Sequence, residues 1–140
     1  MKVNREYSDP IKIRAHHILC IQGFQGYGYS KDFETHMQRI IIFLDTHPTT
    51  KIQIITKTDE ICSYCPYNYK NSCNMDKYSP IIMEKLDKLI IKKFLLKENE
   101  IYPIEDILKL VNDNINHNTL IEICGNCSWN NKCLFFKNKI

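Results

Sequence analysis

The chain carries the stretch EICSYCPYNYKNSC at residues 60–73 and a second version of it, EICGNCSWNNKC, at residues 122–133. Both begin with Glu-Ile-Cys-x-x-Cys-x-aromatic-Asn and end with Asn-x-Cys, so the two stretches form an internal repeat. Two cysteines separated by two residues can turn both sulfurs toward one centre, as zinc and iron–sulfur sites require. We therefore expect the fold to be organised around two cysteine-ligand loops, each of which follows an apolar element that anchors it.

The number of cysteines favours iron–sulfur over zinc. A tetrahedral zinc site would be complete with the Cys-x-x-Cys pairs alone and would leave the third cysteine of each repeat unused. An iron–sulfur centre accommodates more thiolates, and a proline directly after a ligand cysteine, here Pro66, is typical of ferredoxin-type sequences. We expect an iron–sulfur cluster of the [4Fe–4S] type, with zinc as the alternative, and the number of clusters stays open. In decreasing order of preference, the candidate ligands are Cys62, Cys65, Cys124 and Cys127, then Cys73 and Cys133, then Cys20.

Composition and charge narrow the function classes. The chain has 140 residues, of which 44% are hydrophobic and 25% are charged, which is typical of one globular domain spanning residues 1–140. The formal charge of +3 is too small to predict nucleic-acid binding. No apolar stretch is long enough to cross a membrane, and the N-terminus has no signal-peptide pattern. We therefore expect a cytoplasmic protein whose partner is an unknown redox protein or a small-molecule substrate.

The remaining sequence is predicted to be mainly α-helical with minor β structure. Ser30 and the Ser79-Pro80 pair are typical helix starts, and Pro103 suits the first turn of a third helix. On the helix after Ser79 we expect Ile82, Leu86, Leu89 and Ile90 to face the core. We expect a small single domain of about four helices with two cysteine-ligand loops. The predicted helical ranges are 15–21, 30–44, 79–96 and 103–115, with a last turn at 119–123, and the predicted strand is 51–56.

A second candidate site lies near the N-terminus, where Arg14 is followed by His16, His17 and Cys20. Residues three and four apart are neighbours on a helix, so both imidazoles can meet the thiol near one face. Imidazole ligates metals and carries protons near neutral pH, and arginine suits an anionic substrate group. We take His16, His17 and Arg14 as candidate catalytic residues. The other histidines, among them His36, are expected to be ordinary surface residues.

These motifs together resemble a known family. Arg14-x-His16-His17-Ile18-Leu19-Cys20, Asp59-x-Ile61-Cys62-x-x-Cys65-Pro66 and Ile123-Cys124-x-x-Cys127-x-Trp129-x-x-x-Cys133 are similar to the bacterial and archaeal domain of unknown function 1284 family. The resemblance extends from about Ile11 to Cys133. It implies a small protein that binds iron–sulfur, and it implies no reaction.

Three functions remain open at this point. The first is a small iron–sulfur protein that transfers electrons or senses the redox state. The second is an iron–sulfur enzyme, in which His16, His17 and Cys20 line an open iron that performs sulfur transfer or dehydration. The third is a binding module that zinc stabilises. Whether the chain is an enzyme stays open.

Overall fold

The computed structural model describes residues 9–26, 30–66, 68–69, 72–73 and 79–124, together with Cys133 and Phe135. Helices make up most of this part of the chain, which confirms the predicted mainly α fold with minor β structure. In chain order the elements are β1 (Ile11–Arg14), α1 (His17–Gly23), α2 (Lys31–Thr46), β2 (Lys51–Ile55), the 3-10 turn η1 (Ile61–Tyr64), β3 (Asn68–Tyr69), β4 (Ser72–Cys73), α3 (Ser79–Lys93), β5 (Ile101–Pro103), α4 (Ile104–Asn114) and α5 (His117–Cys124).

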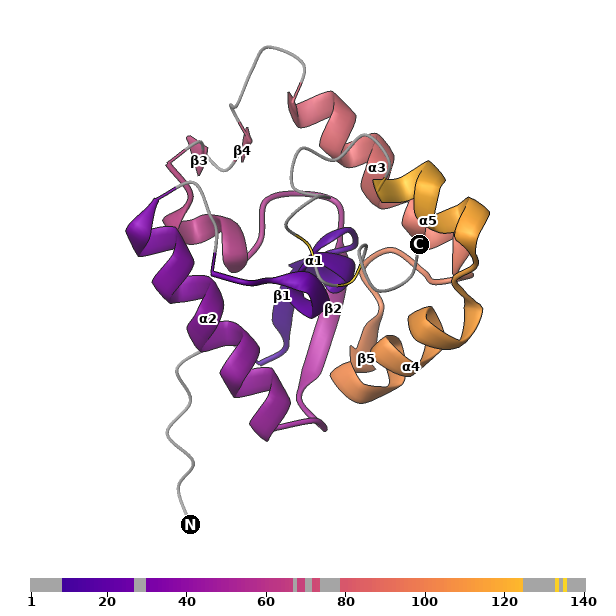
Figure 1. Ribbon diagram of the computed structural model, residues 1–140, viewed down its shortest axis with the longest axis horizontal. Helices are drawn as coiled ribbons and strands as arrows, with labels where there is room; N and C mark the ends of the chain where they lie inside the picture. Colours follow the sequence, from indigo (N-terminus) through magenta and orange to yellow (C-terminus); the bar gives the residue numbers. More distant parts are fainter. Residues whose placement is uncertain are drawn as a thin grey trace.

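A small sheet with the strand order β1-β2-β5 lies at the centre of the fold. Strand β1 runs parallel to β2, with Ile11 opposite Ile52, whereas β5 runs antiparallel to β2. Parallel neighbours need a long crossover connection, and here α1 and α2 provide it. Figure 1 shows α2 along one side of the sheet and α4 along the other. The crossover has one important consequence: β1 and β2 end at the same edge of the sheet.

The core is built largely from isoleucine. Side chains alternate between the two faces of a strand, and this alternation buries Ile11 and Ile13 of β1 while Lys12 stays exposed. Ile52 and Ile54 of β2 are buried in the same way. The alternation breaks at Arg14, which is buried although its two neighbours in the chain, Ile13 and Ala15, are buried as well. Helices contribute most of the remaining core: Ile18, Leu19, Ile21, Phe33, Met37, Ile40, Leu44, Ile90, Ile104, Ile107, Val111, Leu120 and Ile123.

Helix α2 follows its sequence pattern closely. Its N-cap is Ser30, whose Oγ accepts a hydrogen bond from the backbone N–H of Phe33 at 3.1 Å, as predicted. The surface assignment of His36 is wrong, because this residue is only 7% exposed. Its Nε2 donates to the carbonyl oxygen of Glu60 at 2.8 Å and thereby ties α2 to the chain just before η1.

The other predicted helices are present, but the first residue of α4 and the buried side of α3 differ from the prediction. Helix α4 begins at Ile104, so Pro103 is its N-cap rather than its first residue. The sequence did not predict β5, which pairs with β2 immediately before α4. On α3 the predicted core face was wrong at Ile82, which is 51% exposed. The buried stripe of α3 instead passes through Asp87 and Ile90 and continues to Phe94, the residue directly after the helix.

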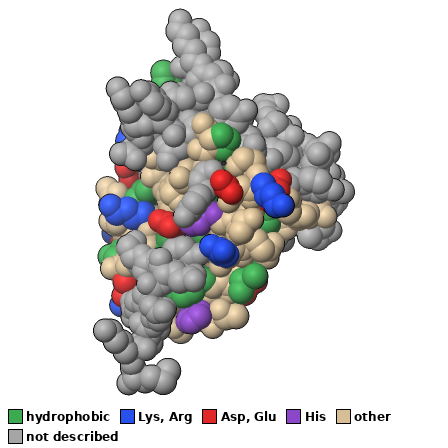
Figure 2. Space-filling view, turned by 90° about the vertical axis from the view of Figure 1, so that its left-hand side faces the viewer, with side chains coloured by type: hydrophobic (Ala, Val, Ile, Leu, Met, Phe, Trp, Pro, Cys, Tyr) green, Lys and Arg blue, Asp and Glu red, His purple; other side chains and the backbone are tan. Residues whose placement is uncertain are grey.

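The surface seen from the α2 side carries charges of both signs. Figure 2 shows lysine and arginine side chains interspersed with aspartate and glutamate over the described part of this face. Such mixing does not form the single-sign stripe that nucleic-acid binding requires. Among the described residues, none of the helices combines the length and apolar character that a membrane crossing needs.

Candidate metal centre

The candidate site forms where the two parallel strands end. Strand β1 ends at Arg14 and leads into His16 and α1, while β2 ends at Ile55 and leads through Asp59 into η1. The backbone N–H of Ala15 donates to the carbonyl oxygen of Ile55 at 3.0 Å, so the two chains stay paired just beyond the strands. The carboxyl ends of parallel strands are the usual place for a site in such sheets. In this protein the ends of β1 and β2 place His16 and His17 next to the first cysteine repeat.

Asp59 is the centre of one half of this site. Its Oδ2 accepts hydrogen bonds from the backbone N–H of Arg14 at 2.8 Å and from Nδ1 of His17 at 2.7 Å. Its Oδ1 accepts from the backbone N–H of Cys62 at 3.1 Å, which holds the start of η1 in place. A nitrogen of His17, an oxygen of Asp59 and Sγ of Cys62 all lie within 4.8 Å of one another. Three residue types that ligate metals therefore converge here.

Asp87 of α3 is the centre of the other half. It is completely buried and accepts a hydrogen bond from Nε of Arg14 on Oδ2 at 2.8 Å. Its Oδ1 accepts from both the backbone N–H and Nδ1 of His16, at 2.8 and 2.7 Å. The guanidinium of Arg14 also donates from Nη2 to the carbonyl oxygen of Thr56 at 3.4 Å. Arg14 therefore holds α3 against the end of the sheet, and its buried guanidinium faces protein groups.

These contacts determine the protonation of the site. Burial alone would raise the pKa of Asp59, but the charge and hydrogen bond of His17 and the N–H of Arg14 lower that pKa to about 2. His16 and Arg14 likewise lower the pKa of Asp87 against the effect of its burial. Burial, followed by the charge of His17, lowers the pKa of His16, which favours the neutral ring. A carboxylate oxygen accepts, so Nδ1 of each ring carries a proton, and in the neutral ring of His16 the lone pair lies on Nε2.

The thiol of Cys62 is held in its protonated form. Burial, and then the nearby carboxylate of Asp59, raises the pKa of Cys62. A buried thiol beside a carboxylate does not ionise spontaneously. A metal cation reverses this balance, because the thiolate is the ligating form and binding releases the proton.

The structure places the cysteines on separate elements. Cys20 lies half-buried on α1, Cys62 lies buried in η1, and Cys65 follows half-buried directly after it. Cys124 ends α5, and Cys133 follows further along the chain, both half-buried. The backbone of Cys73 belongs to β4, but its side chain lies outside the described part, as does Cys127.

Cys133 returns to the first helix. A Cβ added at Gly23, the last residue of α1, would overlap Sγ of Cys133 and would lie 2.9 Å from the backbone nitrogen of Phe135. Because α1 has 3.6 residues per turn, Gly23 lies on the same face as His16 and Cys20, within an arc of roughly 60°. The glycine therefore lets the last cysteine of the second repeat approach the helix that carries the first cysteine of the chain.

We expect Gly23→Ala to destabilise the protein by about 1–3 kcal/mol, the usual cost of overpacking. The added methyl group must displace Cys133 or Phe135 from α1. Urea denaturation measures the change. The double variant Gly23→Ala/Cys133→Ala should recover part of the loss, because it removes the sulfur that the methyl group overlaps. A single variant as stable as the original chain would show that Cys133 does not pack here.

Sequence reasoning missed Asp59 and Asp87 as site residues. Asp59 was visible within the first cysteine motif, three residues before Cys62. The signal for Asp87 is subtler: it occupies the helical stripe of Ile90 and Phe94, so a lone carboxylate replaces an apolar residue on a buried face.

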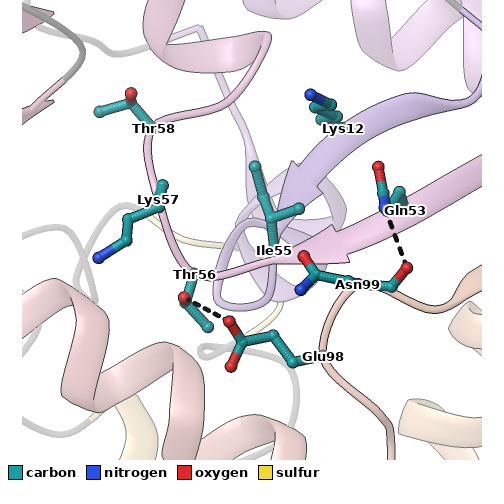
Figure 3. A pocket seen from close by; sticks show the side chains of 8 residues that line it. All are labelled: Lys12, Gln53, Ile55, Thr56, Lys57, Thr58, Glu98 and Asn99. Atoms are coloured by element: carbon teal, nitrogen blue, oxygen red, sulfur yellow. Dashed lines mark hydrogen bonds between the residues drawn. The ribbon is translucent and has the colours of Figure 1, made fainter.

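The hollow in Figure 3 is separate from this site. It lies at the outer face of β1 and β2 and includes Lys12, Gln53 and Lys57. Two hydrogen bonds connect its rim, from Thr56 Oγ1 to Glu98 and from Gln53 Nε2 to the carbonyl oxygen of Asn99, at 3.2 and 3.0 Å. Its lining contains neither cysteine nor histidine, so it has no soft metal ligand.

Comparison with known proteins adds a family but no activity. Residues 28–133 match the family described as Protein of unknown function (DUF1284). Searches of curated proteins and of solved structures found no match.

Proposed function

The chain belongs to the DUF1284 family, and we propose from its own residues that it is an iron–sulfur cluster-binding protein, most simply of the [4Fe–4S] type. A cluster held by thiolates supplies reversible one-electron transfer. The function we propose is electron transfer or redox sensing in the reducing environment of the cytoplasm, with an unidentified redox partner.

One observation carries the proposal: thiols from distant parts of the sequence gather along α1. Cys133 packs at Gly23, Cys20 lies one turn earlier, and Cys62 is beside His17 at the start of the helix. The helix has seven residues and is therefore only about 10 Å long. In a reducing compartment, thiols placed along one short helix favour a soft metal over disulfides.

The residue types suit such a cluster. Cys62 and Cys65 would supply thiolates from the η1 loop, Cys20 from α1, and Cys124 and Cys133 from the second repeat. Of these thiols, Cys62 belongs to the group of potential ligand atoms that lie within 4.8 Å of one another in the described part of the chain. A structural zinc site is complete with four ligands, so one zinc ion would leave some of these cysteines unused.

Anaerobic purification of the full chain tests the proposal. We expect a brown protein that contains iron and acid-labile sulfide in equal amounts and absorbs at about 400 nm. Cys62→Ser and Cys65→Ser should lose most of the iron, whereas Ser63→Ala, between them, should retain it. A colourless chain without iron, or one that carries only zinc, would contradict the proposal.

A further inference from the structure

The two histidine–aspartate pairs point to a role for imidazole in the metal centre. A histidine that ligates a metal through one nitrogen almost always donates the N–H of its other nitrogen to a carboxylate or carbonyl. His16 and His17 both have this arrangement before any metal is present, since their Nδ1 atoms lie 2.7 Å from Asp87 and Asp59. The pattern occurs twice, on adjacent residues whose ring centroids are 4.4 Å apart.

The position of Cys62 is the second observation. Its Sγ lies within 4.8 Å of both a ring nitrogen of His17 and a carboxylate oxygen of Asp59. Nitrogen and sulfur donors of the kinds that bind zinc and iron therefore lie side by side in this part of the structure.

We infer that the metal centre has mixed nitrogen and sulfur ligation, in which His17, oriented by Asp59, provides an Nε2 ligand in addition to the thiolate of Cys62. His16, oriented by Asp87, is the second candidate nitrogen ligand. This inference rests on the proposed function and extends it, because it adds a nitrogen ligand to the thiolates. Asp59 and Asp87 are then positioning residues that fix the tautomer and the orientation of each ring.

The test uses the full chain with its native metal, labelled with ¹⁵N only in histidine. Pulsed electron paramagnetic resonance of the paramagnetic centre should detect strong ¹⁵N hyperfine coupling. His17→Gln should remove at least one of the couplings, whereas His117→Gln, at an exposed histidine at the start of α5, should leave the spectrum unchanged. If the histidine variants fail to fold, the labelled original chain still decides the question.

A second measurement addresses the positioning residues. The probe is Co²⁺, titrated into the metal-free chain and followed by its visible absorption bands. We expect Asp59→Asn to lower the Co²⁺ affinity about 10–100-fold, and we expect no change for Asp106→Asn, an exposed aspartate on α4. Unchanged Co²⁺ affinity in Asp59→Asn would overturn the positioning role.

The outcomes separate this inference from the proposed function. Iron and sulfide present without histidine ¹⁵N coupling would leave the iron–sulfur proposal intact and overturn the imidazole ligation. A chain that binds neither iron nor Co²⁺ would overturn both. Strong histidine coupling in a centre without sulfide would support the imidazole ligands and reject the cluster.

Discussion

Asp87→Ala should lower the free energy of unfolding by about 3–5 kcal/mol, the usual cost of leaving a buried charge without its partner. Arg14 is 4% exposed and Asp87 is completely buried, so water cannot replace the lost carboxylate. The variant also deprives His16 of the acceptor for its backbone N–H and its ring. Because a domain of this kind is stable by only about 5–15 kcal/mol, urea denaturation should detect the change easily.

Two control variants identify the cause. Asp113→Ala removes a carboxylate whose partner, Lys109, is exposed on α4, and we expect no measurable loss of stability. The double variant Arg14→Met/Asp87→Leu removes both buried charges and should be more stable than Asp87→Ala alone. If Asp87→Ala were as stable as Asp113→Ala, the buried pair would not support the junction between α3 and the sheet.

Acid should destabilise the metal-free chain in two steps. The pKa of His16 is lower in the folded protein than its ordinary value of 6.5, so the unfolded chain binds more protons and stability falls below about pH 6.5. The pKa of Asp59 is lowered from 3.8 to about 2, so its contribution is complete above about pH 4 and is lost as the pH falls toward 2. That second step amounts to about 2 kcal/mol.

Thermal or urea unfolding at a series of pH values measures both steps. Asp59→Asn should be less stable at pH 7 and should show a flatter dependence below pH 4, because it has no carboxylate to protonate. Asp106→Asn, at an exposed position of α4, serves as the control and should follow the original curve. A stability that stays constant from pH 7 to pH 3 would contradict the ionised Asp59 on which this network depends.

Local patterns predicted the helices well, because their causes are local. Ser30 caps α2 through its own side chain, and Phe33, Met37, Ile40 and Leu44 are buried at helical spacing. Strands β1 and β5 were harder to predict, since each has at most four residues and is stabilised by pairing with β2. That pairing joins residues about 40 to 50 positions apart, and no local pattern records it.

The face of α3 illustrates the same limit at a single position. Counting only apolar residues placed Ile82 inside, although it is exposed, and did not identify Asp87 as a buried residue. Asp87 is buried because Arg14 and His16 supply donors for both of its oxygens. Burial of a carboxylate depends on its partners, which come from β1 and the start of α1 and cannot be read from α3 itself.

The sequence by itself determined which potential metal ligands the chain carries, since the repeated cysteine motif and the His-His segment are matters of residue type and spacing. Tertiary structure alone decided which of these groups meet. The parallel pairing of β1 and β2 places His17 beside Asp59 and Cys62, and Gly23 admits Cys133 to the far end of the same helix. These contacts depend on the crossover between β1 and β2 and on the missing side chain at Gly23. Both join segments that are far apart in the sequence, so only the packed structure reveals them.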